Sequence, residues 1–515
     1  MKKEYLVSAT EMKQLDNNTI IRTGIPSLVL MERAAFAIAM EVMEYLGKPQ
    51  GKKVLVVSGN GNNGADGVCA GRILKEYGYS VDIYVVKSSH EYTEEMKVQL
   101  QTAAKYDIPL LTASELCPET YDVVIDAIFG IGLNREIKGE AKELIEKLNA
   151  SQGYIVSADI PSGINASTGE ICGTAIQADV TITFGFYKCG QIFYPGRLYC
   201  GELKKAQIAI DENSLYDMQP KMSAYFLEKE EEKIDYPRSP MGNKGTFGKV
   251  LVIAGRAQTA GAAILCATSA LRSGCGMTAV ITEQANKEAF LLALPEAMLG
   301  TYNSSDDQET VAAKIEKWTQ WADVVVIGCG LGLDERAYQI LKDTINYCQK
   351  PLVCDADALQ LLAIHEDLAQ QIKASTGNGK RDVVLTPHPG ELAALAHCQI
   401  ADIKADRGVA EKISRDYGAI IIAKDADTMC IKNGETKYLN TTGNDGMATA
   451  GSGDVLAGLT ASLIAQSNRI QMSIYEAVCL SVFIHGYAAD VSAEKCGKRF
   501  LVASDIIEAY KYILK

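Results

Sequence analysis

The chain has 515 residues, of which 47% are hydrophobic and 22% are charged, so it is long enough for two or more globular domains. Its formal net charge of −13 disfavours a nucleic-acid partner, because an acidic surface repels a phosphate backbone. Fourteen scattered cysteines without a C-x-x-C pair, and only five histidines, argue against structural zinc and favour a reducing compartment. No signal peptide and no run of about 18 apolar residues are evident, so we expect a cytoplasmic protein without a membrane partner.

The first predicted strands are β-branched runs that alternate with helical patterns. The helical patterns lie at residues 65–77 and 140–148. Such alternation is typical of a parallel sheet with helices on both faces. The strands are expected at residues 53–59, 80–86, 121–130 and 154–163.

A second series of strands begins at residue 249 and continues to residue 425. The charge run Glu228–Lys233, a solvated helix or a linker, and the PRSP segment at residues 237–240 separate the two series. We therefore predict an α/β protein with two domains, residues 1–215 and residues 216–515. Ligands of such open sheets collect at the carboxyl ends of the strands.

The first strand runs into the sequence GNGNNGADG, Gly59–Gly67, before a helical pattern. Glycines allow a sharp turn and a close approach to a ligand, and a following helix offers free amides to an anion. The acid expected about 20 residues further on could only be Asp82, which opens the next strand, so we do not predict an ordinary NAD site. A plain tight turn remains an equal alternative.

Two further strands end in an aspartate, namely Asp126 before FGIGL and Asp159 before IPSG. Asn63, Asp126 and Ser162 offer oxygen ligands without sulfur or imidazole, a set that suits a hard cation. The alternative for each aspartate alone is a helix N-cap.

These motifs, with LMERAA at residues 30–35 and FGFYKCGQIFYPG at residues 184–196, resemble the NAD(P)H-hydrate epimerase domain. The resemblance covers about residues 1–215 and implies a Rossmann-like three-layer domain that interconverts the R and S hydrates of NADH and NADPH. It implies K⁺ held by Asn63, Asp126 and Ser162, and Asp159 as an acid/base beside the nicotinamide. Lys188 is a candidate catalytic partner, with a surface or phosphate-facing lysine as an equal alternative. The substrate-binding residues implied are Asn62, Asn63, Gly64, Ala65, Asp66, Gly130, Ile131, Gly132, Leu133, Asn134, Arg135 and Asp159.

A second glycine-rich stretch is Asn440–Gly458, in which residues 451–454 stand just before an apolar helical pattern at residues 455–465. Backbone amides at such a helix start can hold a transferring phosphoryl group, and Asp454 can act there as a general base. The stretch lacks the Walker form, so we exclude a P-loop. An N-cap role for Asp454 is again the alternative.

Seven ordered motifs, among them GCGLG, DADAL and LTPHPGE, resemble the ribokinase-like NAD(P)H-hydrate dehydratase over about residues 222–515. The fused order matches the bifunctional NAD(P)H-hydrate repair family of bacteria. This resemblance implies a ribokinase-like three-layer domain that dehydrates the S hydrate with ADP, giving AMP and phosphate, and uses Mg²⁺. The substrate contacts implied are Ala262, Gly330, His388 and Asp454. The nucleotide contacts implied are Lys424, Asp425, Ala426, Asp427, Thr428, Gly451, Ser452 and Gly453.

The chain departs from that family pattern at two places, of which the second concerns the nucleotide segment. Asn243 stands where a histidine is usual, and Asp425 and Asp427 place two acids where a phosphate-bearing ligand would bind. We read His485, within an apolar helical pattern, as a core histidine. The alternative function is a ribokinase-like vitamin kinase fused to a non-catalytic Rossmann-like domain. We expect small-molecule substrates and a homo-oligomer.

Overall fold

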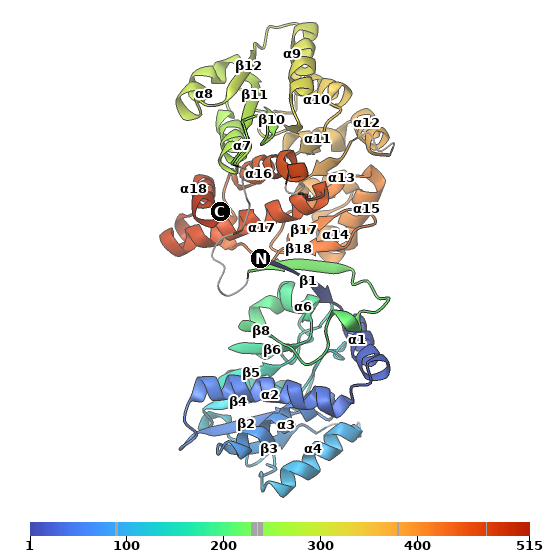
Figure 1. The fold of residues 1–515 in the computed structure, drawn as a ribbon, viewed down its shortest axis with the longest axis vertical. Coiled ribbons are helices and arrows are strands. Elements are labelled where there is room, and N and C mark those ends of the chain that lie inside the picture. Colours follow the sequence, from blue (N-terminus) through green and yellow to red (C-terminus); the bar gives the residue numbers. More distant parts are fainter. Residues whose placement is uncertain (88–90, 228–233, 235–239, 378–380, 470, 515) are drawn as a thin grey trace. The chain divides into compact units, whose positions relative to one another are not determined.

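The computed structural model describes residues 1–87, 91–227, 234, 240–377, 381–469 and 471–514. The expected charge run Glu228–Lys233 lies outside these residues. The chain forms two compact units, an N-terminal unit of Glu4–Ser223 and a C-terminal unit of Ala224–Lys515 together with Met1–Lys3. Each unit is an α/β structure with a largely parallel sheet, which confirms the predicted fold class (Figure 1).

The N-terminal unit is built on a six-stranded sheet in the order β3-β2-β4-β5-β6-β8, and every neighbouring pair is parallel. Its register aligns Val57 with Asp126, and Asp126 with Ser157. The carboxyl ends of the central strands therefore meet at one edge. The strands are β2 (Lys53–Ser58), β3 (Ser80–Val85), β4 (Val123–Ala127), β5 (Tyr154–Ala158), β6 (Val180–Phe184) and β8 (Glu202–Ala206).

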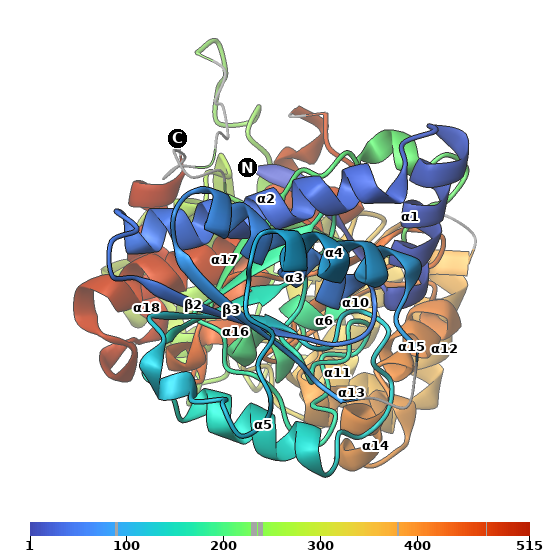
Figure 2. The same ribbon diagram turned by 90° about the horizontal axis from the view of Figure 1, so that it is seen from below.

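Alternate residues of these strands pack on opposite faces of the sheet, as the period of a strand requires. Val54 and Val56 pack with residues of the helices on one face, whereas Leu55 and Val57 pack with Leu144 on the other. Figure 2 shows α2 and α3 running across the sheet, with α5 at its other side. The helices are α1 (Ala9–Arg22), α2 (Ser27–Leu46), α3 (Asn62–Glu76), α4 (Glu94–Lys105), α5 (Glu140–Asn149) and the short α6 (Cys189–Ile192).

A separate parallel pairing in this unit fixes the segment that follows β6. Strand β1 (Lys2–Val7) pairs with β7 (Tyr187–Lys188) through Leu6 and Val7. Lys188 is thereby held in a strand with no exposed surface.

The C-terminal unit contains the strand order β12-β11-β10-β13-β14-β15-β16-β17-β18. From β12 to β16 in this order, neighbouring strands pair in parallel. Strand β17 pairs antiparallel with both β16 and β18. The strands are β10 (Lys249–Ile253), β11 (Met277–Glu283), β12 (Met298–Tyr302), β13 (Val324–Ile327), β14 (Leu352–Cys354), β15 (Val383–Leu385), β16 (Ile420–Ala423), β17 (Met429–Ile431) and β18 (Lys437–Leu439).

Two groups of helices cover this sheet (Figure 1). On one face, one apolar core joins the strands to α7, α16, α17 and α18. The helices of this group are α7 (Ala260–Arg272), α16 (Ser452–Gln466), α17 (Ile474–Cys496) and α18 (Ala503–Ile513). The others are α8 (Lys287–Ala293), α9 (Gln308–Trp321), α10 (Glu335–Tyr347), α11 (Asp357–Ile364), α12 (Glu366–Gly377), α13 (Pro389–Ala396), α14 (Ile400–Ala405) and α15 (Gly408–Tyr417).

Helix α17 is a long, largely apolar helix of the C-terminal unit. It has 23 residues, and its most apolar 18-residue window has a mean hydropathy of 1.2, enough by length and composition to cross a membrane. However, 72% of that window is buried within the protein, as in a core helix. Acids at Glu476 and Asp490 flank the apolar stretch around His485, so it is not an uninterrupted run of about 18 apolar residues.

Candidate active sites

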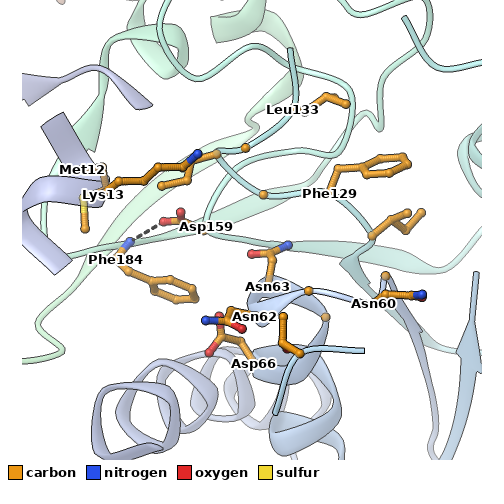
Figure 3. Close-up of a pocket in the computed structure, with 18 of the residues that line it drawn as sticks. Met12, Lys13, Asn60, Asn62, Asn63, Asp66, Phe129, Leu133, Asp159 and Phe184 are labelled. Carbon is orange, nitrogen blue, oxygen red and sulfur yellow. Dashed lines mark hydrogen bonds between the residues drawn. The ribbon is translucent and has the colours of Figure 1, made fainter. Parts of the chain in front are cut away.

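A cavity of about 1090 Å³ opens at the carboxyl ends of the strands of the N-terminal unit (Figure 3). It is lined by the loops that follow β2 and β4, by Asp159 after β5, and by one side of α1. Its size is suitable for a large metabolite, because ligand pockets usually measure about 300–1,000 Å³. The cavity lies where a parallel sheet places its ligands.

The glycine-rich turn after β2 forms part of this cavity, and close backbone packing requires glycine at positions 59 and 64. A Cβ atom on Gly59 would lie 2.1 Å from the Ile128 carbonyl oxygen, and one on Gly64 would lie 2.1 Å from the Gly59 carbonyl oxygen. The tight-turn interpretation is therefore correct, and the same turn carries Asn62 and Asn63 to the cavity wall. Helix α3 begins at Asn62, three residues earlier than predicted, because Gly61 is the last extended residue.

Asp126 is fully buried at the end of β4, and hydrogen bonds surround its carboxylate. Its Oδ1 accepts from the Ser162 hydroxyl at 2.5 Å, and its Oδ2 accepts from the Ser157 hydroxyl at 2.8 Å and from the Ser162 amide at 2.9 Å. Burial raises the pKa of Asp126, and these bonds oppose the rise. The N-cap alternative is wrong, because Asp126 belongs to a strand.

The oxygen atoms near Asp126 fit a monovalent hard cation. The Ser162 hydroxyl also contacts the Phe129 carbonyl oxygen at 3.3 Å, so a carboxylate, a hydroxyl and a carbonyl meet. The amide of Asn63 packs beside Gly130, and its buried Nδ2 has no hydrogen-bond partner among the described residues. If this amide is rotated by 180°, the Asn63 side-chain oxygen takes the position of Nδ2. No hydrogen-bond donor would then compete with a cation for that oxygen.

Asp159 and Lys188 form a buried ion pair at the cavity. The Lys188 ammonium donates to Asp159 Oδ1, to Thr183 Oγ1 at 2.9 Å and to the Phe184 carbonyl at 3.1 Å. Asp159 Oδ1 also accepts from the Phe184 amide at 3.0 Å, drawn as the dashed line in Figure 3. Burial lowers the pKa of Lys188, and the charge of Asp159 opposes that change. The surface alternative for Lys188 is therefore wrong.

The backbone of Asp159 is also unusual, with φ at 64° in the left-handed region. The Gln191 side chain holds its carbonyl oxygen at 2.6 Å, and its amide donates to Ile182 at 2.9 Å. No helix begins at this residue, so its N-cap alternative is wrong as well. Backbone strain of this kind is often found at functional sites, because the surrounding structure has to enforce it.

Most of the substrate-binding residues predicted for this unit line the cavity, but not all. Ala65 and Lys188 are buried behind its wall, and Asp126 and Ser162 have no exposed surface. The sequence analysis missed Met12, Lys13 and Asp16 of α1, for which no motif gave a signal. The predicted residues that line the cavity are Asn62, Asn63, Gly64, Asp66, Gly130, Ile131, Gly132, Leu133, Asn134, Arg135 and Asp159.

In the C-terminal unit, the second glycine-rich stretch leads into α16. Gly451 adopts φ 89° and caps the helix, which begins at Ser452, three residues earlier than predicted. The N-cap interpretation of Asp454 is therefore wrong, because Asp454 is the third helical residue. The first amides of α16 lack intrahelical partners, so Asp454 lies at the positive end of the helix dipole.

A buried ion pair lies directly against this helix start. A Cβ atom on Gly453 would lie 3.2 Å from Lys424 Nζ, and Lys424 Nζ donates to Asp355 Oδ1 at 2.8 Å. Burial disfavours the charge of Asp355, but the Lys424 charge and hydrogen bonds from Lys424 and Thr386 hold its pKa below the ordinary value. Asp355 was missed as a site residue, although the DADAL motif at the end of a strand contains it.

Two further acids share this charge network. Burial and the charge of Asp355 raise the pKa of Asp454 to about 6. Burial raises the pKa of Glu391 to about 7, and Glu391 lies 3.9 Å from Lys424 Nζ and accepts from the His388 amide at 2.9 Å. A carboxyl group with a pKa near neutrality is suited to proton transfer.

The structure also shows where the remaining predicted residues of this unit lie. His388 caps α13, where its Nδ1 accepts from the Gly390 amide at 3.0 Å. Ala262 lies in the first turn of α7, and Gly330, with φ 62°, packs against Thr259 after β13. His485 is buried, which confirms its core assignment, and its Nε2 lies 3.5 Å from the Ser452 hydroxyl.

The residues that depart from the expected nucleotide pattern are accommodated by local bonds. Asp427 pairs with Arg407 at 2.9 Å, which offsets its charge, and Asp425 Oδ1 accepts from the Ala426 amide at 2.8 Å. Thr428 bonds back to the Asp425 carbonyl at 2.6 Å. Asn243 Oδ1 accepts from the Gly245 amide at 2.9 Å and closes a turn.

We predict that Lys424→Met strongly destabilises the C-terminal unit. Removing one partner of a buried ion pair leaves an uncompensated charge, which costs about 3–5 kcal/mol of unfolding free energy. Urea unfolding followed by circular dichroism measures the loss. Lys432→Met removes a more exposed pair with Asp382 and is the matched control, expected to cost at most about 1 kcal/mol.

In the double variant Lys424→Met/Asp355→Asn the loss falls below the sum of the two single losses, because no lone charge remains. Equal losses for Lys424→Met and Lys432→Met would contradict the assigned pairing.

Comparison with known proteins gives a match for each half of the chain. The profile described as NAD(P)H-hydrate dehydratase matches residues 250–511, and the profile described as YjeF-related protein N-terminus matches residues 27–190. The bifunctional NAD(P)H-hydrate repair enzyme Nnr of Thermofilum pendens is 32% identical over 500 residues, covering 95% of this chain and 92% of that protein. The enzyme of the same name from Moorella thermoacetica is 32% identical over 530 residues, covering 99% and 97%.

Among solved structures, an ADP/ATP-dependent NAD(P)H-hydrate dehydratase from Bacillus subtilis, co-crystallised with ATP and Mg²⁺, is similar to part of the chain. Its identity is 24% and its TM-score is 0.45, with 53% of this chain and 91% of that chain covered.

Proposed function

Because the chain belongs to the family of bifunctional NAD(P)H-hydrate repair enzymes, we propose that its two sites restore hydrated NADH and NADPH in two steps. The N-terminal unit interconverts the R and S hydrates, and the C-terminal unit dehydrates the S hydrate. The observation that carries the second step is Asp454, a carboxyl with a raised pKa at the free amides of α16. The vitamin-kinase alternative is disfavoured because full-length relatives match both halves in the same order.

The dehydration starts from a hydroxyl on C6 of the nicotinamide ring, which is a poor leaving group. Asp454 accepts the hydroxyl proton as the oxygen attacks the terminal phosphate of ADP, and AMP leaves. The amides of Gly451 to Gly453 stabilise the negative charge that develops on the phosphoryl oxygens. The phosphate then leaves with the C6–O bonding electrons as the ring nitrogen lone pair forms the N1=C6 bond, and loss of a C5 proton restores the reduced cofactor.

Mg²⁺ would bind mainly through nucleotide phosphates and water, and would neutralise their charge. The carboxylates available to it are those of Asp355 and Asp454, whose oxygen atoms lie within 4.8 Å of each other and of Cys329 Sγ. Asp355 already carries the Lys424 ion pair, and Asp454 is needed as the proton acceptor, so water would mediate most contacts of the metal with the protein. The neighbouring Lys424 ammonium adds a fixed positive charge beside Gly453.

The epimerase site combines Asp159 and Lys188 with the oxygen cluster around Asp126. We assign the K⁺ site to Asn63, Asp126 and Ser162, where K⁺ would attract the substrate phosphates. The support is the donor chemistry and the buried amide of Asn63. The cavity beside them has room for a dinucleotide.

The repair assay tests the function directly. The S hydrate of NADH, incubated with the full chain, Mg²⁺ and either ADP or ATP, should regain absorbance at 340 nm. Asp454→Asn should reduce that rate about 10²- to 10⁴-fold, because it removes a general base. A stable phosphorylated product without regained absorbance would instead establish a kinase.

The pH dependence of dehydration follows from the pKa of Asp454. Only the deprotonated carboxylate accepts the proton, so kcat/KM should be constant above the pKa of about 6 and fall below it. At pH 5 we expect a rate about tenfold below the plateau. Glu391→Gln removes the neighbouring acid of pKa about 7. If kcat/KM of this variant still falls below about pH 6, the titrating group is Asp454. If the fall disappears, the titrating group is Glu391.

Replacement of K⁺ by tetramethylammonium should slow the conversion of R to S hydrate. In Asp126→Asn, the K⁺ concentration for half-maximal rate should rise about tenfold or more, because a charged ligand is lost. Ser157→Ala is the control, since it removes one hydrogen bond to Asp126 without removing a predicted ligand. An epimerase rate independent of the cation would contradict the K⁺ site.

A further inference from the structure

We propose that Asp66 is a second catalytic acid/base residue of the epimerase site, and that it acts on the face of the nicotinamide ring opposite Asp159. This inference rests on the proposed epimerase function and assigns a chemical role to a residue expected only to bind substrate. It follows from the positions and bonding of the two carboxyl groups in one cavity.

The two carboxyl groups enter the cavity from different elements. Asp66 lies on α3, whereas Asp159 lies in the loop after β5. In Figure 3, Asp66 lies on the helix in the lower part of the view, beside Asn62, and Asp159 lies above it, with the amide of Asn63 drawn between these two levels. A planar ring seated between these two levels would present one face to each carboxyl group.

The bonding of the two groups differs sharply. Asp159 is held by Lys188 and by the Phe184 amide. The Asp66 carboxyl makes no hydrogen bond and no ion pair with any residue in the described part of the chain, although it is half-buried. Carboxyl groups removed from water are normally hydrogen-bonded. An unsatisfied one that lines a cavity is therefore available to a ligand.

The charges around Asp66 favour its protonated form. Burial, together with the charges of Asp159 and Asp16, raises the pKa of Asp66 well above its ordinary value, and Lys188 opposes the rise. The pair thus offers a carboxylic acid on one side and an ion-paired carboxylate on the other. Neighbouring carboxyl groups with different protonation states commonly divide the acid and base roles.

Epimerisation at C6 needs both roles. Asp66 donates its proton to the C6 hydroxyl, the C6–O bond breaks and water leaves, while the N1 lone pair forms an N1=C6 iminium. A water molecule then attacks C6 from the Asp159 face and gives a proton to the Asp159 carboxylate, as the N1=C6 electrons return to N1. The opposite hydrate results, and the two carboxyl groups regain their original states by exchanging one proton with solvent.

The test uses the full chain and measures two rates in H₂¹⁸O, namely R-to-S conversion and incorporation of ¹⁸O at C6 of each hydrate. In Asp66→Asn, conversion should fall about 10²- to 10⁴-fold. Incorporation of ¹⁸O at C6 should persist only for the hydrate whose hydroxyl lies on the Asp159 face, because Asp159 is unchanged in this variant. Asp66→Glu should recover part of the conversion. A merely structural role for Asp66 would not separate exchange from conversion.

Three controls separate failure of this inference from failure of the proposed function. Glu76→Gln changes an acid of the same helix that pairs with Arg72 on the surface, and it should convert like the parent protein. Dehydration of the S hydrate by Asp66→Asn should be unchanged, which verifies folding of the C-terminal unit, and retained NADPH binding to the N-terminal unit verifies its cavity.

If the parent protein does not convert the hydrates, the epimerase function itself fails. If Asp66→Asn converts at the parental rate, or loses exchange of both hydrates while still binding NADPH, the assignment of Asp66 to one face is overturned.

Discussion

Both sites depend on a carboxylate that is buried at the carboxyl end of a parallel strand. Removing a charge from water costs several kcal/mol unless other groups replace the lost hydration. Asp126 is stabilised by hydroxyl and amide donors from the neighbouring strand and loop, whereas Asp355 is stabilised by the Lys424 ammonium. The loops that supply these partners are therefore fixed in place, and the reactive groups lie on them.

The two solutions give the two sites different chemistry. Neutral donors leave the Asp126 cluster with a net negative charge, which matches a role in holding a cation. The Lys424 ammonium offsets the charge of Asp355, and burial raises the proton affinity of the neighbouring carboxyl groups of Asp454 and Glu391. The same architectural rule thus underlies the proposed cation site in one unit and the proposed proton acceptor in the other.

Much of this arrangement could be predicted from the sequence. The alternation of strands and helices gives the α/β class, and the glycine motifs mark the turns, because close backbone approach excludes any side chain there. Helix starts were misplaced by three residues, since Asn62 and Ser452 are polar residues that a hydrophobic pattern does not count. Residue spacing also gave no sign that Lys188 is buried. Lys188 lies in β7, which pairs with β1 from the other end of the unit's sequence, and local spacing does not reveal such a pairing.

The partners of the reactive groups were hardest to foresee. Asp355 and Lys424 are 69 positions apart and meet only once β14 and β16 lie in the same sheet. The acids at Asp425 and Asp427 are unfavourable beside a phosphate-bearing ligand in the sequence pattern, but the structure supplies Arg407 as a counter-charge for Asp427. Long-range pairing of this kind leaves no trace in local composition.

Helix α17 has a consequence for how the chain folds. It packs against α16 and α18, and its apolar surface is covered only when those neighbours and the sheet are in place. Before that, the chain exposes a segment with the length and hydropathy of a membrane span. Folding of the C-terminal unit thus competes with aggregation until α17 has docked onto α16.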